Sequence, residues 1–225
     1  MKNRIALPNI AEIFPFWQDV STKDRHELSR YIKCRALDQG DVFFSDDELT
    51  VSTLYVSSGE LCYYTINENG RDTTLYRLYK GQYSSFLEAR LYDSQSYPLM
   101  MQAELPSEIY SIAPEVSRYL YKSYPSVQKF ERDIFYERSS FVMDSLQRML
   151  SISSRQRLAM FLVDETQRSG SRTIVMTQEQ IGRYVGTHRE MISRMMNVFA
   201  RRGIVRMRRG RIEVLNINEL KKIAQ

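Results

Sequence analysis

The sequence predicts an α+β protein in which a small antiparallel β jelly-roll barrel precedes one long helix and a helical C-terminal domain. Three observations lead to this fold class. Short runs rich in aromatic and β-branched residues, broken by glycine-containing turns, continue to residue 112. From Pro125 the apolar residues take helical spacing, and the stretch 126–151 contains no Gly or Pro. Beyond Ser151, hydroxyl residues followed three positions later by Gln or Glu mark successive helix starts.

Composition sets the broad class. A chain of 225 residues suggests one large or two modest domains, and 43% hydrophobic with 12% aromatic residues is enough to bury a core. No apolar run approaches the length of a membrane span. Cys34 and Cys62 are the only cysteines, so neither a disulfide scaffold nor a CxxC metal site is present. We therefore expect a reduced, cytoplasmic compartment, no membrane partner, no metal and no cofactor.

The net charge of +5 is unevenly distributed along the chain. From Ser171 onwards there are 12 Lys and Arg against 4 Asp and Glu, a net of +8, while the preceding residues carry 20 against 23, a net of −3. A basic terminal segment on a near-neutral body predicts a polyanionic partner for that segment alone.

The N-terminal part is expected to begin with helix around Ala11–Phe16 and Thr22–Lys33. Strand-like runs follow as VFFSDD, TLYVSSGELCYYTIN, TTLYRLY, LMMQAEL and EIYSI. Turn dipeptides separate several of these runs: Gln39-Gly40, Ser58-Gly59, Asn69-Gly70 and Lys80-Gly81. Asn69-Gly70 lies between two alternating runs and predicts a hairpin. Many short strands joined by tight turns indicate a barrel or jelly roll.

The segment after Pro125 reads as one long helix. Its apolar residues fall at helical intervals: Val127, Phe130, Ile134, Phe141, Leu146 and Met149. Arg138 and Ser145 interrupt this stripe, so it is not a regular heptad seam. A helix this long needs a second surface, and we expect a homodimer held through Ile134, Phe141 and Met149; packing within its own chain is the alternative. The predicted domains are 1–124, an effector barrel; 125–152, a dimerisation helix and hinge; and 153–225.

Three potential capping boxes divide the C-terminal domain into helices: Ser153…Gln156, Thr177…Gln180 and Thr187…Glu190. A short helix over Gln178–Val185 would end at Gly186, and the next would start directly after it. This is helix-turn-helix geometry, in which the second helix enters a major groove. The run IVRMRRGRIEVL alternates on both sides of Arg209-Gly210 and predicts a hairpin wing.

The second of these helices has a polar face formed by Arg189, Glu190, Ser193, Arg194 and Asn197. Arginine reads guanine in a bidentate manner and glutamate accepts from cytosine, so Arg189, Glu190 and Arg194 suit base reading. Backbone contacts are expected from Thr187 and His188, although His188 suits solvent equally well, and from the wing arginines: Arg206, Arg208, Arg209 and Arg211.

The block TQEQIGRYVGTHREMISRMMNVFARRGIV resembles the winged helix-turn-helix of the Crp/Fnr family of bacterial transcription regulators. It is similar in its T-x-x-x-I-G-x-x-V-G-x-x-R-E-x-x-x-R spacing and in the G-I-V that begins the wing. The order of parts matches as well: an eight-stranded cyclic-nucleotide-binding-like barrel, a dimerisation helix, a hinge and a reader. The resemblance implies a sequence-specific regulator that binds double-stranded DNA as a homodimer on a palindrome and has RNA polymerase as a partner.

Several site residues come from this resemblance. Arg189, Glu190 and Arg194 align with base-reading positions, and Ser193 aligns with a DNA contact of the Fnr-like branch. Thr177 and Gln178 align with residues that contact the DNA backbone.

The barrel departs from the cyclic-nucleotide-binding pattern. Phe86 stands where the ribose-binding Glu is expected, and Ser96, Tyr97 and Pro98 stand where an Arg-Ser pair should bind phosphate. We therefore expect no gating by cyclic nucleotide; a displaced phosphate site at Glu88 and Arg90 remains an alternative. Two cysteines cannot ligate an iron–sulfur cluster. The effector is unidentified, and aromatic residues form either its pocket or barrel packing: Tyr64, Tyr83, Phe86 and Tyr97.

Two other classes of protein fit the sequence less well. A cupin-like metal enzyme needs converging histidines, and this chain has only His26 and His188, with no Ser-His-Asp or Cys-His set in the barrel. A non-specific single-strand binder would interleave aromatic residues with arginines, and the predicted reading face has none. The sequence therefore predicts a regulator and not an enzyme.

Overall fold

A computed structural model describes the chain apart from residues 1–9, 45–46, 49–51, 67–71 and 88–98. It divides into two compact units, Met1–Val142 and Met143–Gln225. The three-part division expected from the sequence stays a prediction. Among the described residues, no helix is both long and apolar enough to cross a membrane.

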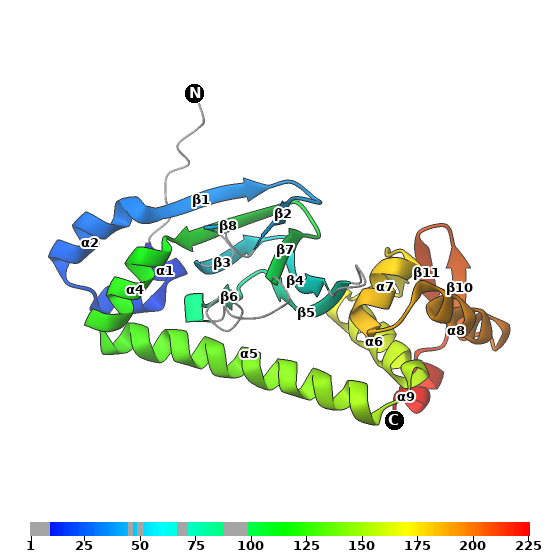
Figure 1. The fold of residues 1–225 in the computed structure, drawn as a ribbon. Coiled ribbons are helices and arrows are strands. Elements are labelled where there is room, and N and C mark those ends of the chain that lie inside the picture. Colours follow the sequence, from blue (N-terminus) through cyan, green and yellow to red (C-terminus); the bar gives the residue numbers. More distant parts are fainter. Residues whose placement is uncertain (1–9, 45–46, 49–51, 67–71, 88–98) are drawn as a thin grey trace. The chain divides into compact units, whose positions relative to one another are not determined.

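The first unit contains two four-stranded antiparallel sheets, with strand orders β1-β8-β3-β6 and β2-β7-β4-β5 (Figure 1). Their strands are β1 (Ile32–Leu37), β2 (Val42–Phe43), β3 (Thr53–Ser58), β4 (Glu60–Ile66), β5 (Asp72–Tyr79), β6 (Tyr83–Ser84), β7 (Leu99–Ala103) and β8 (Ser107–Ile112). Neighbouring strands are mostly distant in sequence, as in a jelly roll, and this confirms the predicted fold class. The predicted hairpin joins β4 to β5, but Asn69-Gly70 lies outside the described residues.

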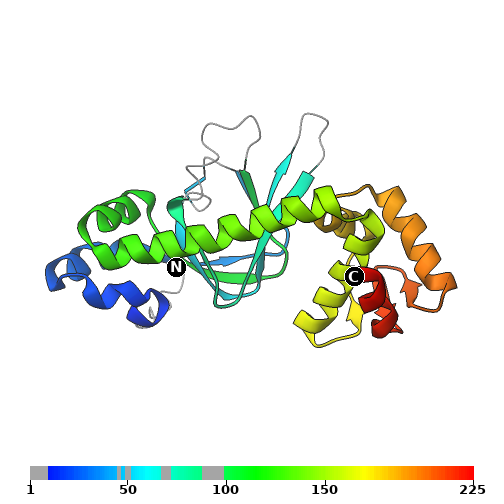
Figure 2. The ribbon, with the colours of Figure 1, turned by 90° about the horizontal axis from the view of Figure 1, so that it is seen from below.

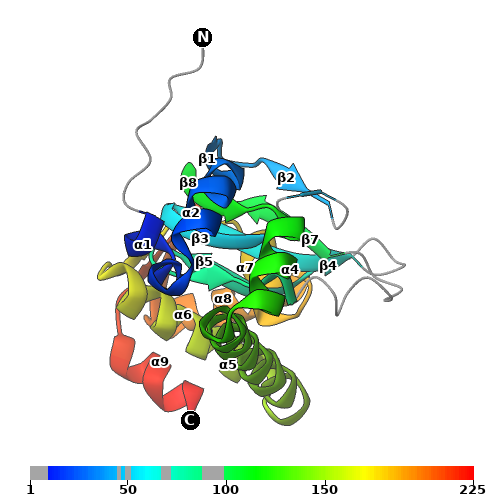
Figure 3. The same ribbon diagram turned by 90° about the vertical axis from the view of Figure 1, so that its left-hand side faces the viewer.

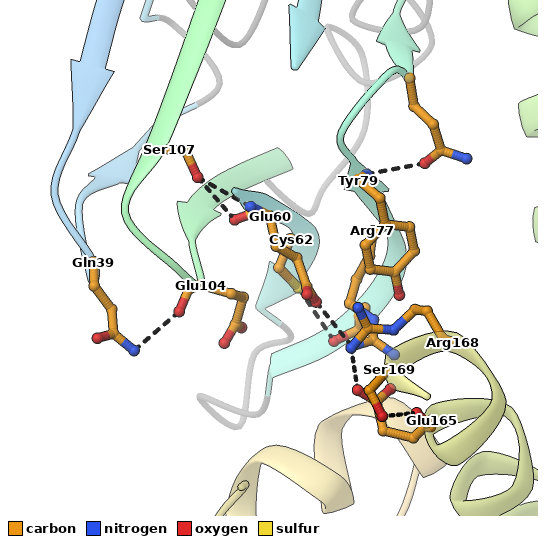
Figure 4. A network of polar contacts seen from close by, with 12 residues as sticks. Gln39, Glu60, Cys62, Arg77, Tyr79, Glu104, Ser107, Glu165, Arg168 and Ser169 are labelled. Carbon is orange, nitrogen blue, oxygen red and sulfur yellow. Dashed lines mark hydrogen bonds and ion pairs between the residues drawn. The ribbon is translucent and has the colours of Figure 1, made fainter. Parts of the chain in front are cut away.

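The core of this unit draws on both sheets. Its fully buried side chains include Leu54, Val56, Leu61, Tyr63, Leu78, Met101 and Ile109. β4 is buried over most of its length, which agrees with its nearly continuous apolar run. The sheets are fixed by a few polar contacts. Glu60 pairs with Arg77 at 2.9 Å and its backbone N–H donates to Ser107 Oγ, which joins β4 to both β5 and β8 (Figure 4).

Three short helices gather at one end of the strands, α1 (Ile10–Ile13), α2 (Thr22–Leu28) and α4 (Pro114–Ser123) (Figure 3). They bury aromatic residues such as Phe14, Phe16 and Trp17. The helix expected to continue to Lys33 ends instead at Leu28, after which a short 3-10 turn leads into β1. Pairing of β1 with β8 along its whole length overrides the local helical signal.

The part of α5 (Pro125–Ser151) that belongs to the first unit, up to Val142, lies along the sheets of that unit (Figure 2). Four side chains spaced four, three and four residues apart are buried there: Val127, Glu131, Ile134 and Arg138. The Glu131 carboxylate accepts hydrogen bonds of 2.5 Å from the hydroxyls of Thr53 and Ser85. The side of α5 that covers the sheets is therefore partly polar, because two of these four residues carry charge.

The second unit combines helices with a small three-stranded sheet in the order β10-β11-β9. Its elements are α6 (Ser154–Ser169), β9 (Thr173–Ile174), α7 (Gln178–Val185), α8 (Arg189–Arg201), β10 (Val205–Arg208), β11 (Arg211–Val214) and α9 (Ile217–Ala224). They surround one apolar core that includes Leu158, Leu162, Ile181, Met196, Phe199 and Leu220, all 0% exposed. The predicted wing is the β10–β11 hairpin, which lies beside α8 (Figure 1).

Candidate DNA-binding surface

Two of the three predicted capping boxes are present. Thr177 Oγ1 accepts from the backbone N–H of Gln180 at 3.1 Å, and Gln180 Oε1 accepts from the N–H of Thr177 at 2.8 Å. Ser153 and Gln156 make the same reciprocal pair at the start of α6. These bonds satisfy N–H groups that a helix start otherwise leaves unpaired, so both helices begin where the sequence predicted.

The third predicted box is wrong. The N-cap of α8 is His188, without a side-chain capping bond, and Thr187 lies in the turn before it. The backbone explains the difference, because the N–H of Thr187 donates to the carbonyl of Gly182 at 2.9 Å. A Cβ atom on Gly182 would lie 2.8 Å from the carbonyl oxygen of Thr187. Close approach at Gly182 and a left-handed Gly186 (φ 69°) therefore set the angle between α7 and α8.

α8 separates its residues into two faces. Ile192, Met195, Met196 and Phe199 are buried in the core of the unit. Of the predicted base-reading residues, Arg189, Glu190 and Arg194 are exposed and Ser193 is half-buried. Asn197 is exposed on the same polar face. The buried face fixes the helix, and hydrogen-bonding side chains point away from the core in its first two turns.

A cavity of about 440 Å³ separates the start of α7 from the wing. It brings together residues from the start of α7, from α8 and from both strands of the wing, among them Thr177, Gln178, Arg189, Arg208, Arg209 and Arg211. Among the residues that the structure describes, no carboxylate forms an ion pair with Arg208 or Arg209. Arginine and backbone N–H groups beside a helix start are suited to phosphate. Six residues predicted from the sequence to contact DNA thus line one cavity.

The other predicted backbone residues are arranged differently. Arg206 pairs across the wing with Glu213 at 3.0 Å, so its guanidinium already has an anionic partner. His188 is exposed at the start of α8, and Thr187 is half-buried in the turn.

Sequence reasoning missed Arg157, which ties the start of α6 to the helix-turn-helix. Its Nε donates to the carbonyl of Val185 at 2.9 Å, and its Nη1 donates to the carbonyl of Ile152 at 2.6 Å. Burial lowers the pKa of this guanidinium from its ordinary value. An arginine in the first turn of a helix looks like a surface charge, so the sequence held no signal for this role.

The predicted effector residues are largely occupied with packing. The Tyr83 hydroxyl donates to the Ile13 carbonyl at 2.6 Å. The buried Phe86 ring meets Tyr121 edge-on, with centroids 5.7 Å apart. Tyr64 is buried in β4, and Tyr97 lies outside the described residues, as do Glu88 and Arg90.

The residues predicted to form the dimer face differ in how exposed they are. Ile134 is buried within its own unit, so its placement on a surface for a partner helix is corrected. Phe141 is 46% exposed and Tyr136, not singled out from the sequence, is 61% exposed. The side chain of Met149 lies outside the described residues. An apolar stripe cannot by itself distinguish the side of a helix that faces its own sheet from the side that faces a partner.

Comparison with known proteins agrees with this geometry. The Crp-like helix-turn-helix domain matches residues 156–223. Electron transport regulator A of Shewanella oneidensis is 24% identical over 201 residues, covering 84% of this chain and 78% of that protein. Transcriptional activator protein anr of Pseudomonas aeruginosa is 25% identical over 217 residues, covering 91% and 86%.

A solved structure extends the likeness to the whole fold. A putative transcriptional regulator of the Crp/Fnr family from Eubacterium rectale has a TM-score of 0.85 and 28% sequence identity, covering 95% of this chain and 99% of its own. A regulator of the same family from Thermus thermophilus, at 18% identity and a TM-score of 0.68, shares the fold. With the polar face of α8 exposed and the wing beside it, the chain belongs to the Crp/Fnr family of DNA-binding transcription regulators.

Proposed function

We propose that the chain acts as a homodimer, and not as an enzyme, and that each subunit places α8 in the major groove of one half of a palindromic site. The observation that carries this proposal is the outward face of α8, where Arg189, Glu190 and Arg194 are exposed together beside the wing cavity. Arg189, Glu190, Ser193 and Arg194 read base edges, and residues of α7 and the wing hold phosphates.

Two subunits are needed because one recognition helix reads only a few base pairs. A two-fold dimer places its readers about one helical turn apart, ~34 Å along the duplex. The exposed Tyr136 and Phe141 of α5 supply apolar area for such a dimer. The family and the names of its relatives, a transcriptional activator among them, support RNA polymerase in the cytoplasm as the partner of the DNA-bound dimer.

The experiment is selection of bound sequences from a random duplex pool by the full chain. We expect enrichment of a palindrome and a specific affinity at least about a thousandfold above that for random duplex at physiological salt. A steep salt dependence with no enriched sequence would leave only non-specific binding. Sedimentation of the protein–DNA complex gives the number of subunits per site.

We also propose that cyclic nucleotide does not gate the chain. Phe86 occupies the place of the ribose-binding acid, and its ring is packed against Tyr121. An aromatic ring offers no acceptor for a ribose hydroxyl, so the family's usual sugar contact is missing.

A second candidate is that the first unit responds to a small anion other than a cyclic nucleotide, and Arg138 is the observation that favours it. This guanidinium is 8% exposed, donates to the Tyr83 carbonyl at 3.2 Å and lies 4.6 Å from the centroid of the Tyr76 ring. Among the described residues no carboxylate pairs with it, and its Nε has no hydrogen-bond partner. A buried cation without an anion destabilises a fold by several kcal/mol, and a phosphate or carboxylate ligand would relieve that cost.

Arg138→Met tests this candidate by stability. If Arg138 binds an anion, the variant should melt at the same temperature as the wild type or higher. Millimolar phosphate, sulfate or benzoate should then stabilise only the wild type. A large loss of stability in Arg138→Met, without any anion effect on the wild type, would make Arg138 a structural residue.

A further inference from the structure

The first turn of α8 carries one apolar side chain that the core does not take up. Met191 is 42% exposed, whereas the four buried residues of this helix, Met195 and Met196 among them, are at most 8% exposed. It follows Glu190 directly and lies three positions before Arg194, so its side chain is a surface neighbour of Arg194. Single exposed apolar residues are ordinary in proteins, and the position of this one, between two predicted base readers, is what requires an explanation.

We propose that Met191 reads thymine in each half-site, through van der Waals contact with the C5-methyl group. The major groove presents donors, acceptors and one apolar group, and that group is the thymine methyl. A thioether on an unbranched chain adapts to a small apolar partner without requiring a fixed rotamer. Glu190 and Arg194 provide polar readout, and Met191 adds a contact that neither of them can make.

The position of the thymine follows from the helix geometry. Side chains three residues apart on a helix are about 5–6 Å apart, and successive base pairs rise ~3.4 Å. The thymine read by Met191 therefore lies within about two base pairs of the guanine that Arg194 reads. This inference rests on the proposed function, because it requires α8 to lie in the major groove.

The test uses the palindrome selected from the random pool, with each thymine replaced in turn by deoxyuridine in both half-sites. Deoxyuridine pairs as thymine does and lacks only the methyl group. At one thymine close to the Arg194 guanine, we expect wild-type affinity to fall about fourfold per half-site, the equivalent of one buried methyl (~0.8 kcal/mol). When both halves are changed, the loss multiplies to roughly fifteenfold.

Variants connect this loss to Met191. Met191→Ala is expected to bind thymine and deoxyuridine duplexes equally, and Met191→Leu is expected to keep most of the discrimination. Met143→Ala is the matched control, because Met143 is also an exposed methionine, at 63%, but belongs to α5. It should retain the full ratio between the two duplexes.

Two results would overturn the inference: a wild type indifferent to deoxyuridine at every position near the guanine, or a Met191→Ala variant that still loses affinity there. In the second case another residue reads the methyl group. Either result leaves the proposed function standing, since the palindrome would already have been selected. Failure to select any sequence would contradict the proposed function itself, so the two failures are distinguishable.

Discussion

The Nε of Arg157 donates to the carbonyl oxygen of Val185 at 2.9 Å, at the last residue of the helix that precedes the reader. The same guanidinium donates to the carbonyl of Ile152, within the predicted hinge, at 2.6 Å. One side chain therefore joins the segment before α6 to the end of α7, so a change in backbone position at Ile152 can be felt at the turn into α8.

Arg157→Met should destabilise the second unit by about 2–3 kcal/mol, because two carbonyl oxygens lose a charged donor. Specific DNA affinity should fall with it, since α7 and α8 lose a constraint. Thermal unfolding and duplex titration measure the two effects. Arg155→Met, at an exposed position in the same turn of α6, is the control and should change neither.

Gly182→Ala should disturb the helix-turn-helix while leaving the first unit folded. A Cβ atom at this position would lie 2.8 Å from the carbonyl oxygen of Thr187, so the turn must open. We expect a loss of about 1–3 kcal/mol in the stability of the second unit and a larger loss in specific binding. Glu179→Ala, an exposed change in the same helix, should alter stability by only a few tenths of a kcal/mol. Equal behaviour of the two variants would contradict the close approach.

Arg189→Ala and Arg208→Ala should change DNA binding in two different ways. Arg189 is exposed at the start of α8, and its loss should cost roughly 1–3 kcal/mol at one G·C pair per half-site and relax discrimination there. Arg208 is exposed in the wing, and its loss should weaken all duplexes about equally and reduce the salt slope. The two effects are distinguished by measuring the affinity of each variant for the selected site, for single-base variants of that site and for random duplex. A uniform loss from Arg189→Ala would place that residue among the phosphate contacts.

Phe141→Asp should dissociate the dimer and abolish specific binding, because a carboxylate would then be buried in an apolar interface. Sedimentation before and after adding the operator is the measurement. Lys122→Asp, an exposed charge change in α4, should leave the dimer intact. A Phe141→Asp protein that sediments as a dimer would move the interface elsewhere, with Tyr136 as the next residue to change.

Cyclic AMP and cyclic GMP at millimolar concentration should alter neither the melting temperature nor operator affinity. A ligand that binds only the folded state adds stability as its concentration passes its dissociation constant, so thermal shift is a direct measurement. A rise with cyclic AMP in the wild type would show that the loss of the ribose-binding acid is tolerated. Its disappearance in Arg138→Met would place the phosphate on α5, and its persistence would point to Glu88 and Arg90.

Much of this fold could be predicted from local sequence. The capping boxes at Ser153 and Thr177 could be predicted because a capping box involves only four consecutive residues and their own backbone. The box at Thr187 is absent because the N–H of Thr187 already donates to the carbonyl of Gly182, five residues earlier in α7. β1 was missed for a different reason, since its strand conformation depends on pairing with β8, distant in sequence.

The candidate site, too, could be predicted only where it depends on the local sequence. The polar face of α8 was visible from helical periodicity, because Arg189, Glu190 and Arg194 fall on one side whatever they contact. Which arginines already have partners was not visible. Arg206 pairs with Glu213, Arg157 holds two carbonyls and Arg138 is buried, and each of these depends on neighbours that the local sequence does not reveal.

The third strand of the wing sheet reduces the conformational entropy that the wing loses on binding DNA. β11 pairs with β9 through Ile212 and Ile174, and only three residues separate Ile174 from the start of α7. The hairpin is thus hydrogen-bonded to the segment that leads directly into the reading motif, so the spacing between the wing tip and the start of α7 is fixed when the unit folds. Little conformational freedom remains to be lost on the duplex, and more of the contact energy appears as affinity.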